Sequence, residues 1–245
     1  MGRAHEVRAA SMAKTAAAKS KLNNKWGKII YLAAKSGVPD PAMNQTLKRE
    51  IEKAKKEQCS ADVIARAIAK AAGGTSGQSY SEARYEVFAQ GGSTLIIECL
   101  TDNVNRTVAD LKTAINKCGA KLGQPGTVMF KYNHYGVLSF SDLTEDEALE
   151  AFLGNDCDIV DIKTEDDFVT VYTEPANYTL AKESLLAVKE DLEFEDDGIS
   201  YVPTETIELN DEDLAKFNRL LSMLSEIDDV QDTYHNVSNL PEEEE

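Results

Sequence analysis

The sequence lacks the signatures of several protein classes. No apolar run approaches the roughly 18–20 residues of a membrane span, and the four cysteines include no CxxC pair. Only three histidines occur, and there is no HExxH, GxSxG, P-loop or dinucleotide-binding motif. We therefore expect no membrane contact, no metal site, no cofactor and no enzymatic activity.

Scattered cysteines also indicate the compartment. Free thiols are typical of proteins in a reducing cytosol, and 245 residues suffice to bury a core without disulfides. Residues 1–20 share the Arg, Lys, Ala and Ser content of organellar transit peptides. We favour a basic arm of the mature protein over that interpretation, and we expect a cytoplasmic location.

Positive charge is scarce overall, with 26 Lys and Arg against 43 Asp and Glu and a formal net charge of −17. Taken alone, this balance argues against nucleic acid, because phosphate repels an acidic surface. The distribution is uneven, however. Residues 1–80, which we call the head, carry a net charge of +9, whereas residues 81–245, the body, carry −26. Such asymmetry points to a basic head that contacts nucleic acid.

Apolar spacing predicts three helices in the head. The first includes Lys25–Ser36, and the third covers Asp62–Ala72. Between them, Asp40 is the expected N-cap of a helix with Pro41 at its first position. Gly73–Ser79 is the expected linker to the body. The buried stripe of the middle helix is expected to consist of Met43, Leu47, Ile51 and Ala54.

Strands and helices alternate in the body. From Val137 to Val202 the predicted order is β-α-β-β-α-β, a ferredoxin-like or split βαβ unit. A strand over Val128–Tyr132 is expected before this unit, and a turn at Asn133–Gly136 is expected to separate it from Val137–Phe140, the first strand of the unit. The fold class is α+β, with an N-terminal helical bundle followed by two ferredoxin-like α+β domains, one inserted in the other. The expected domains are 1–79, then 80–132 together with 206–245, and the inserted 133–205.

Basic residues in the first two helices are the candidate nucleic-acid site. No carboxylate occurs from Ala9 to Ile30, and Lys and Arg bind phosphate without reading sequence. An ordinary solvated helix face is the alternative, above all in the second helix, where glutamates offer i,i+4 partners. The short join before the third helix allows a helix-turn-helix, although an αα-hairpin explains the same pattern. The assigned residues are Lys14, Lys19, Lys21, Lys25, Lys28, Lys48, Arg49 and Lys53.

The segment Asp102–Thr107 is the most distinctive motif of the body. Asp102 or Asn103 is suited to cap the helix that follows. A helix start with free N–H groups beside Arg106 is also suited to bind a phosphate or carboxylate. We favour capping and keep Asn103, Asn105 and Arg106 as a possible anion or partner site.

These residues resemble a known family. Gly91–Ser93 followed by Glu98–Thr107, and later Asp228–Asn236, are similar to the signature of the YebC/PmpR family of probable transcriptional regulatory proteins. In the head, Asp40-Pro41 and Ala67–Lys70 continue the match. The resemblance spans nearly the whole chain and implies a three-domain, cytosolic, non-enzymatic regulator of gene expression.

The resemblance leaves two functions open. The first is a DNA-binding transcriptional regulator that uses the basic head, which we favour. The alternative is a ribosome-associated translation factor that binds ribosomal RNA, since a mitochondrial relative activates translation of a cytochrome oxidase subunit. The acidic body either provides solubility alone or binds a basic protein partner.

Overall fold

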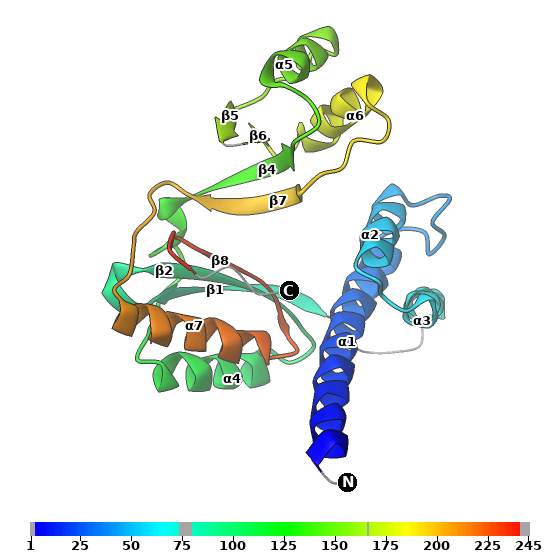
Figure 1. Cartoon of the computed structure of the whole chain (residues 1–245). Coiled ribbons are helices and arrows are strands. Elements are labelled where there is room, and N and C mark those ends of the chain that lie inside the picture. Colours follow the sequence, from blue (N-terminus) through cyan, green and yellow to red (C-terminus); the bar gives the residue numbers. More distant parts are fainter. Residues whose placement is uncertain (1–2, 74–79, 166, 241–245) are drawn as a thin grey trace. The chain divides into compact units, whose positions relative to one another are not determined.

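The computed structural model describes residues 3–73, 80–165 and 167–240, with only the backbone of residues 3–18. It confirms the α+β class and the helical N-terminal region (Figure 1). Among the described residues, no helix is long and apolar enough to cross a membrane. The helices are α1 (Arg3–Lys35), α2 (Gln45–Lys56), α3 (Ala61–Ala72), α4 (Val104–Lys117), α5 (Glu145–Gly154), α6 (Tyr178–Val188) and α7 (Asp211–Ser225). The strands are β1 (Ser81–Phe88), β2 (Thr94–Thr101), β3 (Lys121–Leu122), β4 (Tyr132–Phe140), β5 (Asp161–Glu165), β6 (Phe168–Thr173), β7 (Asp196–Pro203) and β8 (Val230–His235).

The strands form two four-stranded sheets. The first has the order β3-β1-β2-β8, and the second has the order β5-β6-β4-β7. In the second sheet the chain order is β4-α5-β5-β6-α6-β7, which confirms the predicted β-α-β-β-α-β arrangement. Strand β4 pairs antiparallel with both β6 and β7, so it lies in the interior of its sheet.

By contacts between Cα atoms the chain divides into two compact units. One comprises Met1–Tyr85, Ile97–Leu122 and Ala215–Thr233, and the other comprises Glu86–Ile96, Gly123–Leu214 and Tyr234–Glu245. The border between them crosses β1 and β2 rather than the predicted domain limits. The three-domain boundaries therefore stay a prediction, and the expected linker Gly73–Ser79 lies almost entirely outside the described residues.

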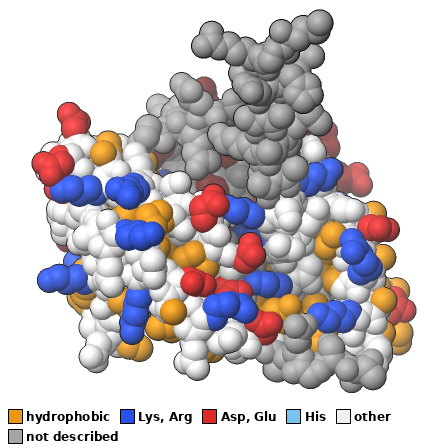
Figure 2. Space-filling model, turned by 90° about the horizontal axis from the view of Figure 1, so that it is seen from below, with side chains coloured by type: hydrophobic (Ala, Val, Ile, Leu, Met, Phe, Trp, Pro, Cys, Tyr) orange, Lys and Arg blue, Asp and Glu red, His pale blue; other side chains and the backbone are white. Residues whose placement is uncertain are grey.

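The helical head packs around α1. Trp26 is buried, and its indole N–H donates to the Glu57 carboxylate at the end of α2, over 2.8 Å. Helix α1 is much longer than Lys25–Ser36, because alanine, the strongest helix former, dominates residues 9–18. The buried side chains at the centre of the head are Trp26, Ile30, Tyr31, Ala33, Ala34, Leu47, Ile51, Ala54, Cys59, Ile64 and Ala67. Lys and Arg lie interspersed with Asp and Glu on the molecular face that Figure 2 shows.

The start of α2 differs from the prediction. Asn44, not Asp40, is the N-cap, and its side chain accepts a hydrogen bond from the Leu47 N–H over 3.0 Å. The Asp40 carboxylate instead accepts from the Ala42 N–H, which forms a local turn that competes with the helix. Met43 therefore precedes the helix and is 73% exposed, so its predicted place in the buried stripe was wrong.

A second difference concerns the entry to β4. The predicted strand at Val128–Tyr132 is largely a 3-10 turn over Met129–Lys131. The buried carboxylate of Glu86 accepts the backbone N–H groups of Val128 and Met129, which are then not available to a strand ladder. The predicted turn at Asn133–Gly136 is part of β4, because pairing with β7 overrides the local turn preference.

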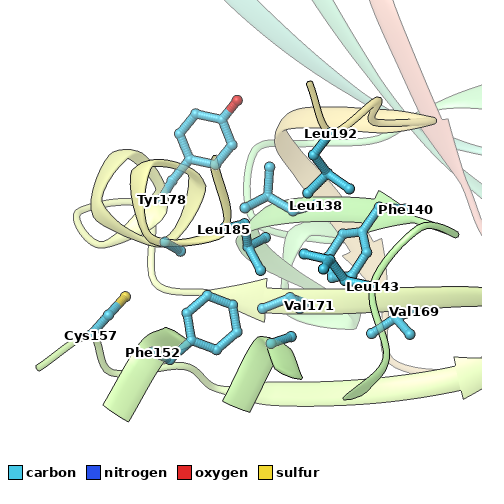
Figure 3. Close-up of a cluster of buried hydrophobic side chains, with 12 residues drawn as sticks. Leu138, Phe140, Leu143, Phe152, Cys157, Val169, Val171, Tyr178, Leu185 and Leu192 are labelled. Carbon is cyan, nitrogen blue, oxygen red and sulfur yellow. The ribbon is translucent and has the colours of Figure 1, made fainter. Parts of the chain in front are cut away.

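The second sheet buries one face against α5 and α6 (Figure 3). Thr144 begins α5 with the predicted capping box, in which its side chain and that of Glu147 bind each other's backbone N–H. The buried cluster consists of Leu138, Phe140, Leu143, Ala148, Phe152, Cys157, Val169, Val171, Tyr178, Ala181, Leu185 and Leu192. This packing holds the strands in one register, so the side chains on the opposite face of the sheet are also fixed in place.

Replacing Gly136 by alanine should destabilise this packing. An added Cβ would lie 2.7 Å from Cβ of Tyr178 and 2.6 Å from Oγ1 of Thr173. Both distances are too short, so we expect the free energy of unfolding to fall by about 1–3 kcal/mol in chemical denaturation. Gly198→Ala on β7 is the control, since a Cβ there meets nothing within 4 Å. An equal loss in both variants would contradict the crowding argument.

Candidate nucleic-acid interface

Three lysines of α1 are bound to carboxylates of the body. Lys21, Lys25 and Lys28 are four and three residues apart, which places them on one face of the helix. Their ammonium groups pair with Glu226 at 2.7 Å, Asp232 at 2.9 Å and Asp229 at 2.8 Å, respectively. The lysine face that the sequence assigns to phosphate therefore contacts acidic side chains of the same chain.

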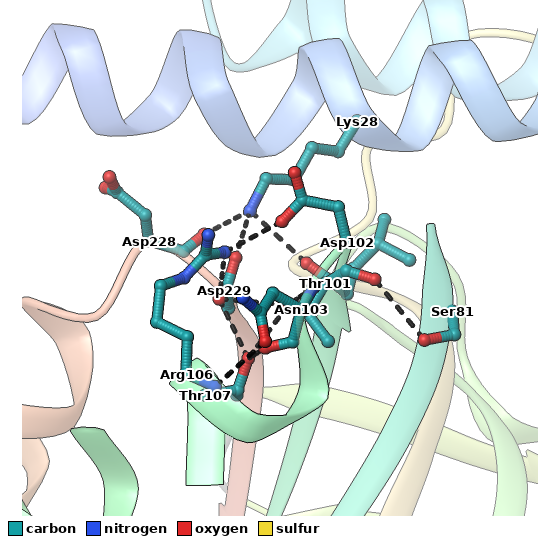
Figure 4. A network of polar contacts seen from close by, with 10 residues as sticks. Lys28, Ser81, Thr101, Asp102, Asn103, Arg106, Thr107, Asp228 and Asp229 are labelled. Carbon is teal, nitrogen blue, oxygen red and sulfur yellow. Dashed lines mark hydrogen bonds and ion pairs between the residues drawn. The ribbon is translucent and has the colours of Figure 1, made fainter. Parts of the chain in front are cut away.

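Asp229 lies at the centre of the most buried of these contacts (Figure 4). Its side chain is 4% exposed. Besides Lys28, it accepts hydrogen bonds from Nη2 of Arg106 at 2.7 Å and from the hydroxyls of Thr107 at 2.9 Å and Thr101 at 3.1 Å. These donors come from α1, the end of β2 and the start of α4. We call Asp229 and these four donors the Asp229 network.

Lys28 uses its whole hydrogen-bonding capacity in this network. The ammonium group has three protons. It donates to the Asp229 carboxylate and to the carbonyl oxygens of Asp228 at 2.9 Å and Leu100 at 3.2 Å. Its side chain is only 14% exposed. In this arrangement Lys28 joins the head to the first sheet and has no proton left to donate to a phosphate.

The network sets the protonation of Asp229. Burial alone would raise the pKa of this carboxyl, but hydrogen bonds from Lys28, Arg106 and Thr107 outweigh burial and lower the pKa to about 2. A charge-assisted contact of this kind is strong because the surroundings screen it poorly. Asp229 therefore stays ionised throughout the physiological pH range.

In the structure, the segment around Asn103 caps a helix and also binds carboxylates of the same chain. The Asn103 side chain caps α4 by accepting from the Arg106 N–H at 3.1 Å, which confirms the predicted capping role. The Arg106 guanidinium bridges Asp102 at 2.9 Å and Asp229 at 2.7 Å. The carboxylates that Arg106 binds in this structure belong to the protein. Asn105 is exposed, nothing in the structure explains it, and a site for an external anion stays a prediction.

A groove of about 1100 Å³ runs beside the network. Tyr31 and Tyr80 line it and meet edge to face, with ring centroids 5.7 Å apart. The lining contains as many acidic as basic side chains, so a phosphate in the groove would meet both signs. The charged lining residues are Lys19, Lys28, Arg66, Lys70 and Arg106 with Asp102, Asp110, Glu226, Asp228 and Asp229.

The remaining assigned residues lie apart from this network. Lys19 is exposed at the groove, whereas the side chain of Lys14 lies outside the described residues. On α2, Leu47, Ile51 and Ala54 face the core of the head. The basic residues of α2 point elsewhere: Lys48 and Arg49 are exposed, and Lys53 is half-buried.

Sequence reasoning missed Asp229. Asp229 is 201 residues from Lys28 and 123 from Arg106, and a single sequence carries no signal for contacts at that separation. The Asp228–Asn236 segment showed only a family resemblance. Its role as the acceptor for the head required the fold.

Metal-ligating side chains do not gather in the described part of the chain. Within residues 3–73, 80–165 and 167–240, no group of three or more His, Cys, Asp or Glu side chains is placed to hold a metal ion. His134 stacks on Tyr201, and burial lowers the pKa of His235. Burial and then the neighbouring Asp229 carboxylate raise the pKa of Cys99 to about 12, so this thiol stays protonated.

Replacing Asp229 by asparagine should show how much the Asp229 network contributes to the free energy of unfolding. The folded pKa of about 2 lies below the ordinary value of 3.8, so ionised Asp229 stabilises the fold above pH 4. We expect that stabilisation, on the order of 2 kcal/mol, to disappear as the pH falls from about 4 to 2. At pH 7, Asp229→Asn should lower the free energy of unfolding by about 3 kcal/mol, because it leaves Lys28 and Arg106 without their counter-ion.

The control for this measurement is Asp228→Asn. Asp228 is exposed, and it is its backbone carbonyl that binds Lys28. Urea denaturation at several pH values should show that the difference between wild type and Asp229→Asn shrinks below pH 4. A constant difference, or an equal loss in Asp228→Asn, would overturn the assignment.

Comparison with known proteins places the chain in a family. Residues 3–74 match the family described as the TACO1/YebC protein N-terminal domain, and residues 80–237 match the TACO1/YebC second and third domain. A "probable transcriptional regulatory protein" of Acholeplasma laidlawii is 50% identical over 238 residues, which cover 97% of this chain and 98% of the relative. One of Pseudoalteromonas translucida is 49% identical, covering 96% and 98%.

A solved structure agrees with these sequence matches. The crystal structure of a conserved hypothetical protein from Aquifex aeolicus superimposes with a TM-score of 0.75 and 32% identity, covering 91% of each chain. The resemblance found in the Glu98–Thr107 and Asp228–Asn236 segments is thereby confirmed. The chain belongs to the TACO1/YebC family.

Proposed function

We propose that this protein is a cytoplasmic, non-enzymatic regulator of gene expression that binds DNA through its basic head. The regulatory role follows the names of two relatives, which are probable transcriptional regulatory proteins at 50% and 49% identity over nearly the full length. The contact with nucleic acid rests on the residues of the head.

The observation that carries the DNA contact is the charge of the first two head helices. Helix α1 contains eight Lys and Arg residues and a single acid, Glu6. Helix α2 contains five Lys and Arg residues and two glutamates. Helices that concentrate cations in this way bind the phosphate backbone and release its counterions.

The structure divides these cations into two groups. Lys21, Lys25 and Lys28 already bind carboxylates of the body. Lys48, Arg49 and Lys53 lie outside the buried stripe of α2, although Lys53 is half-buried and Arg49 also meets Glu50 at 3.3 Å. We assign the first contacts with phosphate to Lys19 and these three residues of α2. Lys21 and Lys25, whose ion pairs are more exposed than that of Lys28, join once phosphate displaces Glu226 and Asp232.

The combined variant Lys48→Gln, Arg49→Gln, Lys53→Gln tests this assignment. We expect weaker binding to every duplex DNA sequence alike, since these residues contact phosphate rather than bases. The slope of log affinity against log salt should decrease by about 0.9 for each phosphate that the variant no longer neutralises. Fluorescence anisotropy with labelled duplexes of different sequence, over a salt series, measures both quantities.

A matched control separates the contact from net charge. Lys112→Gln, Lys117→Gln, Lys121→Gln removes the same charge from exposed positions in the body and should leave the salt slope unchanged. Equal weakening in both triple variants would overturn the α2 assignment. Co-sedimentation with ribosomes that survives DNase treatment, together with no measurable duplex binding, would contradict the DNA target.

A further inference from the structure

The second sheet has one face that does not take part in its core. Side chains alternate between the two faces of a strand. Leu138 and Phe140 of β4 point into the cluster under α5 and α6, so Tyr135 and Val137 point to the opposite face. On β6, Val171 is buried in the same cluster, and Tyr172 shares the face of Val137, its partner in the register.

This face has an aromatic centre and open space beside it. Tyr135 and Tyr172 are half-buried and meet edge to face, with ring centroids 6.0 Å apart. On β7, Gly198 is paired with Val137, and a Cβ built there meets no atom within 4 Å. The row Tyr172–Val137–Gly198 therefore ends on β7 at a position without a side chain. We call this surface the tyrosine face.

Acidic residues surround the tyrosine face. Asp161 is paired with Tyr172, and Asp196 with Ser139. Burial raises the pKa of the Tyr172 hydroxyl. The Lys163 ammonium opposes this effect, and the carboxylates of Glu165, Asp161 and Asp196 add to it, so charges of both signs lie near this hydroxyl. Residues 132–203 contain three lysines, no arginine and 19 acidic residues, a net charge of −16.

One cation already occupies the edge of this surface. The ammonium of Lys163 lies 5.5 Å from the centroid of the Tyr172 ring, within the range of a cation–π contact. Lys163 is the only basic residue of β5, and its side chain is 54% exposed. Lys163 also pairs with Asp161 at 3.8 Å, so the tyrosine face holds a cation between its ring and a carboxylate, with Glu165 and Asp196 as further carboxylates near Tyr172.

We propose that the tyrosine face binds an extended segment of a protein partner that is rich in arginine and lysine. Guanidinium groups stack on tyrosine rings and pair with carboxylates, and the apolar stems of both side chains cover Val137 and the space over Gly198. Sheets with central aromatic residues also bind single-stranded RNA. Here the charge of −16 opposes a phosphate backbone and attracts a basic peptide. This inference does not depend on DNA binding by the head.

The variant Gly198→Arg tests the proposal in the full-length protein. It places a cation in the empty space of the tyrosine face, so it should weaken binding of a fluorescein-labelled peptide of alternating arginine and glycine by about tenfold or more. Gly154→Arg, at the end of α5, is the matched control. It adds the same charge at another position where a Cβ meets nothing within 4 Å, and it should change the affinity less than about twofold. Equal weakening in both variants would show that only net charge matters and would overturn the proposal.

Two substitutions of Tyr172 test the aromatic contact. Tyr172→Leu keeps an apolar side chain but removes the ring, and should weaken peptide binding about two- to fivefold, whereas Tyr172→Phe should retain it. Thermal unfolding of each variant checks the fold, and the phenylalanine variant keeps the test decisive if the leucine variant is unstable. Tighter binding of a labelled oligouridylate than of the peptide, lost in Tyr172→Leu, would assign the face to RNA instead.

Discussion

A buried carboxylate, Asp229, is the group on which the junction between the head and the first sheet depends. Four donors from three segments converge on it, and two of them, Lys28 and Arg106, are charged. A buried pair of this kind contributes little net stability compared with a well-packed apolar contact, but losing one partner leaves a charge without compensation. The network therefore acts mainly on specificity. It selects one register of α1 against the chain, because sliding the helix by a residue would remove the Lys28 ammonium from its three acceptors.

The ion pairs also reduce the positive charge that the head presents to a partner. A formal +9 suggests a uniformly basic surface, yet the Lys21–Lys28 face of α1 is partly neutralised by carboxylates of the body. The pairs at Glu226 and Asp232 are exposed enough that salt screens them, whereas the Lys28–Asp229 pair is buried and resists screening. Binding to a polyanion at α1 thus involves exchange of one set of negative partners for another. Binding at α2 needs no such exchange for the exposed Lys48.

Local features of the sequence predicted local structure well. The Thr144 capping box, the Asn103 cap and the apolar stripe Leu47, Ile51, Ala54 all depend on residues within a few positions of one another. Two errors arose where a local preference was overridden, once by a competing local turn and once by strand pairing. The Asp40 turn displaced a helix start, and pairing with β7 converted a turn-like Asn133–Gly136 segment into strand. The Asp229 network and the tyrosine face were not predictable, because both consist of side chains brought together from distant strands and helices. Tyr172, Val137 and Gly198 form one row only through the register of β6, β4 and β7, and this register is known only once the sheet is assembled.

The sequence separation of 201 residues between Lys28 and Asp229 has a consequence for synthesis. Chains grow from the N-terminus at about 5–20 residues per second, so Lys28 precedes its carboxylate by roughly 10–40 s. Throughout that interval the head helices exist without Glu226, Asp229 and Asp232. The head of the growing chain thus carries its lysine charges without these partners, and its lysines meet their own acids only after the segment with Glu226, Asp229 and Asp232 has been made.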